Sequence, residues 1–543
     1  MYTAGQATFG WQQVRNIGDI ARFGSLVFQI FSVVQLTLIL CFALVLAGGG
    51  IAQEKDRGTL LLLLMTDLRD RELVWGKLFS GLLIVVVLLA ASLPVFFLVH
   101  LLGGVALDQI AWSLAICAAA GLAAGSWGAL VAFWREKTFQ TLAISVLGLV
   151  LFVGVAELII GLFGSGSTVG QWAALLNPYR ALLDIWNPLA RHTELGVVQV
   201  SAFGPVLAMS VLAVLLNVAA IARVRVWNPS RGVHNAAVAE EKRDRDATSA
   251  ATREIWTNPV IWREIRTRAY GRKIFVIKFA YFVLTAFAVA SLYSAGAPGE
   301  ATAGLMAPIG TAFIGLGLVS LILINAQAVT ALTSERDAKT LELLLMTDVS
   351  AKEFIFGKLG GILYNAKEAV LIPLALIAFY AFQGGLRLEY LIYLSFGFLV
   401  LVCFVSMLGL HAGLSFESSR SAIANSLGTI FFLFIGICIF MMLLVEAHSS
   451  FFLQLQSFVV FIGVGSVGLY ASLSHKNPSA ALRVSAGVLP FLTFYAITEY
   501  LLAGSLGVCL AISTAYGFTT LAMLIPAVSE FDVALGRTTL DKG

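Results

Sequence analysis

Residues 54–78 read EKDRGTLLLLLMTDLRDRELVWGKL, and residues 335–359 read ERDAKTLELLLMTDVSAKEFIFGKL. The two stretches align without a gap at an offset of 281 residues, and 14 of the 25 positions are identical. Each copy begins where a long apolar run ends and stops where another begins. A repeat at this period is a duplicated domain, because solenoid units recur every 20–50 residues or so. We name the two copies the first and the second repeated stretch.

The repeated stretches have the composition of a helix at a membrane surface. Charged residues open each copy, and a short apolar run, 60–65 in the first, follows them. This run is too short to cross a bilayer and is flanked by charge, which is typical of an interfacial helix. An ordinary amphipathic loop between two spans is the alternative, and the ungapped second copy argues against it.

A further helix is predicted to begin inside each stretch. Short polar pairs end the apolar run: Thr66-Asp67 and Thr347-Asp348. In the second stretch, Ser350 and Glu353 have the spacing of a capping box. The first stretch has Arg69 in place of Ser350, so we expect Asp67 to cap the helix there. A Gly-Lys pair then marks entry into the next span, with the lysine at the level of the headgroups.

The shared pattern E-[KR]-D-x-x-T-L-x-L-L-L-M-T-D-x-x-x-x-E-x-x-x-G-K-L resembles the signature of ABC-2 type transporter permeases. In that family a segment of this form joins the second and third spans on the cytoplasmic side. Asp67 and Asp348 stand where the family often has proline. Gly58 keeps the family's glycine, whereas Lys339 replaces it in the second stretch.

The resemblance implies that both stretches couple the chain to a separate ATPase. The residues expected to do so are Glu54, Lys55, Asp56, Thr59, Thr66, Asp67, Glu72 and Lys77 in the first stretch, and Glu335, Arg336, Asp337, Thr340, Thr347, Asp348, Glu353 and Lys358 in the second. The implied partner is an ATP-binding-cassette subunit in two copies, which would bind ATP and Mg²⁺; this chain itself is expected to bind no cofactor. The implied location is the bacterial cytoplasmic membrane.

Composition and apolar runs predict an all-α, polytopic membrane protein. Hydrophobic residues make up 59% of the 543 residues and charged residues only 12%, and the mean hydropathy is +0.90. About 12–13 membrane-spanning helices are expected, because each run approaches the length of roughly 20 residues that a span needs. The runs are 25–50, 79–102, 110–134, 139–163, 203–223, 273–294, 305–333, 361–384, 388–414, 424–446, 451–472, 485–504 and 507–527.

The runs fall into two permease halves, 1–223 and 273–543, joined by a cytoplasmic linker over 224–272. The linker has mixed charge and few large apolar residues. Its end, 254–266, alternates aromatic and basic residues, which indicates a helix on an anionic membrane surface. Nucleic-acid binding is the rival interpretation, and the position directly before a span disfavours it.

Charge in the short loops gives the orientation. Lysine and arginine are concentrated on the side of the two repeated stretches, which places these stretches, the linker and the C-terminus in the cytoplasm. Met1 then lies outside. Tyr-Thr-Ala-Gly at 2–5 resembles Tyr-Ser-Ala-Gly at 293–296, which follows the first span of the second half. We therefore expect that a first span is missing and that the gene starts upstream.

Ionisable residues inside the apolar runs are candidates for function, because burying them in a membrane is costly. Most lie close enough to a span end to reach the interface. His411 and Glu499 remain as possible intramembrane polar residues, and His411 is alternatively a hydrogen-bond donor between helices. The five cysteines and six histidines do not have metal-ligand spacing, so no metal site and no disulfide framework is indicated.

No catalytic set is evident. The Gly-Lys pairs lack the preceding glycine and the following hydroxyl of a phosphate-binding loop. The chain is therefore not expected to be an enzyme, and ATP hydrolysis is expected in a partner. The favoured function is the permease of an ATP-driven exporter. A secondary transporter or channel with duplicated halves is the alternative, as is a membrane scaffold of a secretion or motility complex. The transported substrate stays open.

Overall fold

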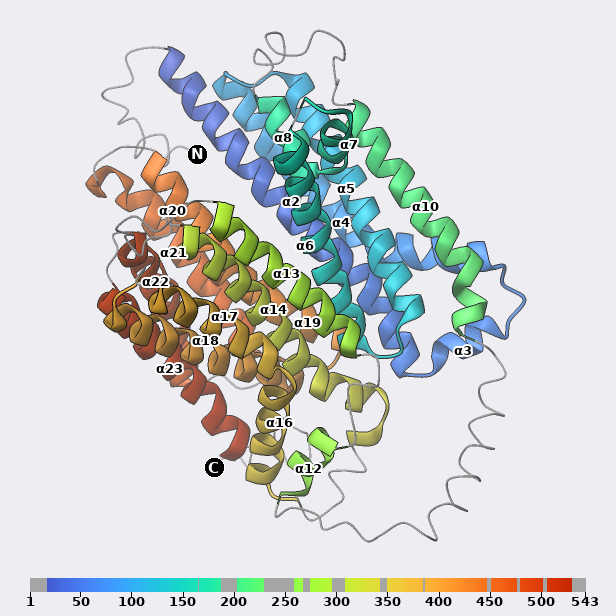
Figure 1. The fold of residues 1–543 in the computed structure, drawn as a ribbon, viewed down its shortest axis with the longest axis vertical. Coiled ribbons are helices and arrows are strands. Elements are labelled where there is room, and N and C mark those ends of the chain that lie inside the picture. Colours follow the sequence, from blue (N-terminus) through green and yellow to red (C-terminus); the bar gives the residue numbers. More distant parts are fainter. Residues whose placement is uncertain are drawn as a thin grey trace.

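The structure, a computed structural model, describes residues 17–164, 166–186, 203–228, 258–266, 274–294, 308–341, 349–383, 386–446, 451–475, 479–501 and 505–529. Within these ranges every regular element is a helix (Figure 1). The prediction of an all-α, polytopic membrane protein is therefore confirmed. The expected start of the chain and most of the linker, 229–257, lie outside the described residues.

The first half forms a bundle, drawn blue to green in Figure 1. Its central pair is α2 and α5, with α4 beside α2 and α10 along α5. The helices are α2 (Ile17–Asp56), α3 (Thr59–Leu64), α4 (Asp70–Leu102), α5 (Leu107–Trp134), α6 (Thr138–Phe163), α7 (Thr168–Leu176), α8 (Pro178–Trp186) and α10 (Phe203–Trp227).

The second half forms a larger bundle, drawn from lime to red. The short α12 (Pro259–Arg266) precedes it. Its helices are α13 (Ile274–Ser294), α14 (Pro308–Asp337), α16 (Ala351–Asn365), α17 (Lys367–Phe382), α18 (Leu388–Ser415), α19 (Ser419–Ile430), the π-helical η1 (Phe431–Gly436), α20 (Ile437–Glu446), α21 (Phe451–Leu473), α22 (Ala480–Leu501) and α23 (Ser505–Ser529).

Where the structure describes them, the thirteen predicted apolar runs are helical, with one interruption at Ala366. Ten helices of the described chain are long and apolar enough to cross a membrane. The helices α16 and α17 make an eleventh candidate, bent by 55° at Ala366, where the sequence predicts one continuous span. Two shorter apolar helices, Phe275–Ala290 and Phe458–Leu473, fall within α13 and α21.

The duplication is visible in the packing. Gly128 of α5 lies against the backbone of α2, and Gly409 of α18 lies against α14; these two glycines are 281 positions apart. A Cβ at Gly128 would come within 2.9 Å of the Leu44 carbonyl oxygen, and one at Gly409 within 2.5 Å of the Ala328 Cβ. Small residues allow helix backbones to approach closely in membranes. The same close crossing therefore builds both halves.

The two halves differ in the pair of helices that precedes the last helix of each half. In the first half the short pair α7–α8 precedes α10, which packs along α5. In the second half the long pair α21–α22 precedes α23, which packs along α18 in the same way. The run 451–472, which has no counterpart in the sequence of the first half, is thus one arm of an additional helical pair.

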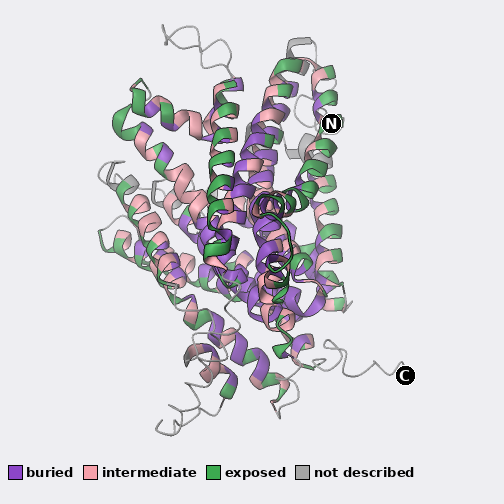
Figure 2. Cartoon of the chain, turned by 90° about the vertical axis from the view of Figure 1, so that its right-hand side faces the viewer, coloured by how far each residue is buried: buried purple, intermediate pink, exposed green. Residues whose placement is uncertain are grey.

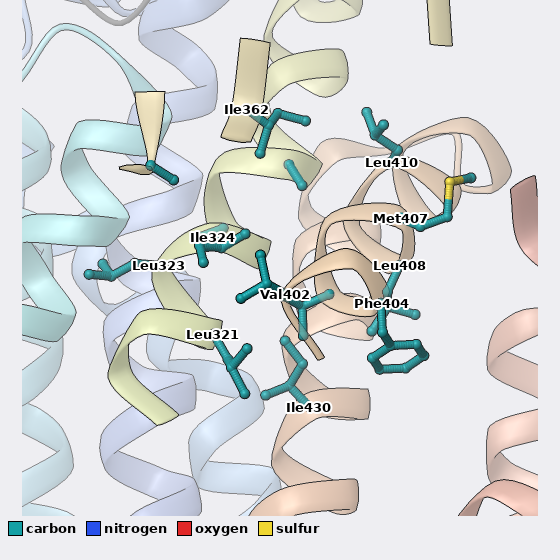
Figure 3. Close-up of a cluster of buried hydrophobic side chains, with 14 of the residues drawn as sticks. Leu321, Leu323, Ile324, Ile362, Val402, Phe404, Met407, Leu408, Leu410 and Ile430 are labelled. Atoms are coloured by element: carbon teal, nitrogen blue, oxygen red, sulfur yellow. The ribbon is translucent and has the colours of Figure 1, made fainter. Parts of the chain in front are cut away.

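The core lies along the middle of each bundle, and the outer faces are apolar as well. In Figure 3, Leu321 and Ile324 of α14 point toward Val402 of α18. Exposed residues lie on the outward faces of the helices (Figure 2), and many of them are large and apolar, such as Leu83 and Leu215. An apolar outer surface suits hydrocarbon rather than water.

Candidate functional site

The two repeated stretches fold alike, at the lower end of the molecule in Figure 1. The first runs from the last turn of α2 through α3 into α4. The second runs from the last turn of α14 into α16, with 342–348 outside the described residues, and these include Thr347 and Asp348. A residue with positive φ follows each long helix: Gly58 at 74° and Lys339 at 57°.

A glutamate–lysine pair closes each stretch on itself. In the first stretch Lys77 of α4 donates to Glu54 of α2. In the second, Lys358 of α16 lies 2.8 Å from Glu335 of α14. Each pair joins the helix that enters the stretch to the helix that leaves it. The backbone of each glutamate is also held by a nearby residue, because Thr59 and Thr340 donate to the carbonyl oxygens of Glu54 and Glu335.

The basic residue after each glutamate holds the end of another helix. A cation is favourable where a helix ends, because the last carbonyl groups carry partial negative charge. Lys55 caps α5 in this way, and Arg336 caps α18. The bonds run from Lys55 Nζ to the carbonyl oxygens of Phe133 (2.5 Å) and Arg135 (2.9 Å), and from Arg336 to those of Gly413 (3.0 Å) and Phe416 (2.6 Å).

The aspartate that follows holds the start of the next helix. Asp56 accepts a hydrogen bond of 2.5 Å from Thr138, the first residue of α6. Asp337 accepts one of 2.5 Å from Ser419, the first residue of α19. A carboxylate is favourable at a helix N-terminus, where free N–H groups carry partial positive charge. Thr138 and Ser419 are themselves 281 positions apart.

The triad Glu-[Lys/Arg]-Asp thus connects one helix to three others in each half. The resemblance implies that these residues contact an ATPase. In the structure, the side chain of each of them bonds to another helix of the same chain. The sequence contains a signal for this role, because Thr138 and Ser419 recur at the same offset as the triad.

The surface that remains free in the first stretch is the tip around α3. Leu62 and Met65 are 64% and 67% exposed, and Leu68 is 40% exposed. Four residues of the predicted coupling set, Thr59, Thr66, Asp67 and Glu72, are also exposed on or near α3. Charged residues surround this apolar tip. We name Leu62, Met65 and Leu68 the α3 tip.

The predicted helix starts are confirmed in one stretch and corrected in the other. Ser350 and Glu353 form the capping box of α16: the Glu353 N–H donates to Ser350 at 3.3 Å, and the Ser350 N–H to Glu353 at 3.0 Å. In the first stretch, Arg69 rather than Asp67 is the N-cap of α4. Its N–H donates to Glu72 at 3.1 Å, so half of the box is retained without a capping side chain.

The second stretch has an additional clamp, made by α12. Glu264 of α12 lies 2.7 Å from Lys358, and Arg263 donates to Glu335. Lys358 and Glu264 are almost completely buried, and Lys358 donates also to the carbonyl oxygen of Ala331 at 3.2 Å. The side chain of this lysine is therefore covered by protein, whereas contact with the headgroups was expected. Buried charges are paired because an isolated one is costly.

Glycines on α16 make room for α12. A Cβ at Gly357 would lie 2.7 Å from the Cβ of Val260, and one at Gly361 would lie 2.5 Å from the Cβ of Glu264. The predicted helix at the end of the linker is present, and one face of it is buried against the protein rather than against lipid. Gly76, at the position equivalent to Gly357, has no such neighbour within 4 Å.

The two halves meet near the same end of the molecule. Arg57 of the first stretch lies 3.0 Å from Asp337 of the second. Above this pair, apolar side chains from both halves form one cluster, made by Val45 of α2, Leu142 of α6, Val329 of α14 and Ile423 of α19 among others. Leu142 and Ile423 are again 281 positions apart. The two halves are therefore in direct contact from the Arg57–Asp337 pair to this cluster.

The two intramembrane candidates are placed differently from each other. His411 is buried in α18, and its Nε2 donates to the carbonyl oxygen of Leu473 at 2.7 Å, which is the interhelical role considered from the sequence. Glu499 lies in the last turn of α22 rather than deep in a span. Among the described residues, no three His, Cys, Asp or Glu side chains gather closely enough to hold a metal ion.

Fold and site together define a duplicated, multi-pass helical membrane protein. Residues 12–225 match the family model described as ABC-2 family transporter protein. The first half of the chain therefore carries an ABC-2 family transporter domain, which confirms the resemblance drawn from the repeated stretches. Comparison with curated proteins and with solved structures finds no significant match.

Proposed function

We propose that the chain is the membrane subunit of an ATP-driven exporter in the cytoplasmic membrane, with its C-terminus inside. A separate ATP-binding-cassette subunit, in two copies, would bind ATP and Mg²⁺ and hydrolyse the nucleotide. The observation that carries this proposal is the α3 tip: Leu62 is exposed on a helix too short to cross a bilayer, and Met65 is exposed directly after that helix. Exposed apolar groups ringed by polar residues mark contacts with proteins or with membranes, and we assign this one to the ATPase.

The triad connects the α3 tip mechanically to the membrane-spanning helices. A push on α3 acts directly on α2 and α4, between which it lies. Through Lys55 and Asp56 it also acts on the end of α5 and the start of α6. These bonds are short and partly charged, and such hydrogen bonds are about twice as strong as neutral ones. The four helix ends are therefore expected to move together when the ATPase moves the tip.

Opening between the halves would require the closed contact to separate. Arg57 must leave Asp337, and the cluster around Leu142 and Ile423 must part. Alternating access then corresponds to a movement of the α2–α6 bundle against the second half. No specific observation favours the alternatives, a secondary transporter, a channel or a membrane scaffold.

Co-purification tests the proposal. Leu62→Glu combined with Met65→Glu places two charges on the tip, and we expect the folded protein to lose its ATPase partner. Val226→Glu is the matched control, because Val226 is similarly exposed, near the end of α10. The control should retain the partner. Retention of the same ATPase by the tip variant, or the absence of any ATPase from the wild-type complex, would contradict the proposal.

A further inference from the structure

An apolar cavity of about 200 Å³ lies inside the second half. It is lined by residues of α14, α18, η1, α20, α22 and α23. Every lining residue belongs to the second half, so the cavity is separate from the surface on which the two halves meet. Cavities of this size that lack polar partners remain free of water and accept apolar ligands.

The polar groups of the wall already have partners or lie at its end. The Thr493 and Tyr516 hydroxyls are 2.7 Å apart and bond to each other. The Tyr516 ring packs edge-on against Phe404 and is stacked with Phe434. The middle of the wall therefore offers a ligand carbon atoms and aromatic faces. A charged or strongly polar ligand would lose its hydration there without replacement.

The cavity is elongated along the helices. It is lined from Phe313 to Leu321 on α14 and from Tyr393 to Leu401 on α18. Eight residues of helix extend about 12 Å. The long axis is therefore parallel to the helices, which is the direction of a hydrocarbon chain in a bilayer.

Two tyrosines mark one end of the cavity. Tyr393 is in the second turn of α18, and Tyr500 is in the last turn of α22, both at the end of the bundle away from the repeated stretches. Tyrosine is enriched where a membrane meets water. The lining residues Ile314, Leu394 and Ile497 are only partly buried. The cavity is therefore open toward the apolar outer surface of the helices.

Part of the wall has no counterpart among the described residues of the first half. Thr493, Ile497 and Tyr500 belong to α22, one arm of the additional pair α21–α22. The first half has the short pair α7–α8 in this place. The added pair therefore builds a wall that the duplicated fold alone does not supply.

We propose that this cavity is a binding site for one acyl chain of a membrane lipid, with the headgroup beside Tyr393 and Tyr500. The site is distinct from the contact between the halves and does not depend on the proposed export function.

Photolabelling in nanodiscs tests the site. The probe is a phosphatidylethanolamine with a diazirine in one acyl chain, used on the full chain, and labelled peptides are mapped by mass spectrometry. Gly397→Leu fills the cavity from α18, where a Cβ would meet only Ile512 at 3.8 Å. Gly317→Leu fills it from α14, where a Cβ would lie 3.5 Å from Phe398. Gly487→Leu is the control, because Gly487 is exposed on α22 and has no neighbour within 4 Å.

We expect labels on the lining segments of α18, α22 and α23 in the wild type and in the control. Each filled variant, checked for folding by gel filtration, should be labelled about tenfold less at these segments. A tenfold loss of affinity corresponds to about 1.4 kcal/mol of binding free energy. Equal labelling of filled and wild-type protein, or labels confined to exposed residues, would overturn the proposal. Labelling by a free diazirine-bearing alkane but not by the lipid would assign the cavity to a small apolar molecule and overturn the lipid site.

Discussion

The two repeated stretches share their sequence and their hydrogen bonds but not their surroundings. In the first, the Glu54–Lys77 pair is about a quarter exposed. In the second, Lys358 is 1% exposed and shared by two glutamates, one of which is supplied by α12. The same motif is thus an accessible pair in one half and a buried cluster in the other.

This difference separates what the motif does from what the linker adds. Bonds present in both copies hold the helix ends together and belong to the fold of each half. Bonds present only in the second copy clamp that stretch to the end of the linker. We therefore expect the first stretch to move more readily than the second, and a pair of ATPase subunits to meet two unequal elements.

The largest loss of stability is expected when the lysine of the second stretch is replaced. Lys358→Ala removes the buried cation that Glu264 and Glu335 share and leaves the buried Glu264 only its longer contact with Arg263 at 3.3 Å, which should cost about 3–5 kcal/mol of stability. Lys77→Ala breaks a partly exposed pair and costs about 1 kcal/mol or less. Chemical unfolding in detergent micelles measures both. Equal losses would mean that the clamp does not distinguish the two stretches.

The glycines give the next effect. Gly357→Ala brings a Cβ to 2.7 Å from Val260 and should cost about 1–3 kcal/mol, because α12 must shift. Gly76→Ala meets nothing and should be neutral or stabilising by up to about 1 kcal/mol, because alanine favours the helix. The same unfolding assay applies. A loss of stability at Gly76 would indicate that a neighbour covers this position too.

The hydroxyl bonds to the two aspartates come next. Thr138→Val and Ser419→Ala each remove the hydroxyl that donates to Asp56 or Asp337. In the same unfolding assay Thr138→Val should cost about 1–3 kcal/mol, because the lost bond is made to a charged group. Ser419→Ala should cost less, because Asp337 keeps its ion pair with Arg57 at 3.0 Å. A larger loss for Ser419→Ala than for Thr138→Val would contradict this order.

The smallest effect is expected at the turn after each long helix. Lys339 has a φ of 57° where Gly58 has 74°, and a lysine is strained in this region. Lys339→Gly should therefore stabilise the protein by up to about 1 kcal/mol, and Gly58→Lys should destabilise it by a similar amount. Unfolding of the two reciprocal variants checks the sign, and a shift of the same sign in both would contradict the equivalence of the turns.

Much of the fold follows from the sequence because apolar length and charge determine membrane helices. The described parts of all thirteen runs are helical apart from the break at Ala366, and the capping box at Ser350 forms as its spacing predicts. The bend at Ala366 is not encoded in such a pattern, since neither proline nor glycine stands there. It depends on packing between distant helices, which composition does not report.

The sequence predicts where the site lies but not which residues its side chains bond to. The repeat identifies Glu54, Lys55 and Asp56 as important, and the resemblance supplies an intermolecular role for them. Their partners on α5 and α6 are about 80 residues away, and pairing over that distance requires the fold. Burial of Lys358 likewise depends on α12, whose basic and aromatic composition indicates a membrane surface instead.

Charge reversal at Glu54 and Lys77 tests most directly whether the motif acts within the chain. ATPase activity of the purified complex is measured for Glu54→Lys, for Lys77→Glu and for the combination of both. Each single reversal sets like charges against each other across α2 and α4, and we predict that it lowers the activity. The combination restores the pair with its ends exchanged, so the activity should return toward that of the wild type. If Glu54 instead acted by contacting the ATPase, the combination would be at least as impaired as Glu54→Lys alone, and that result would contradict the account.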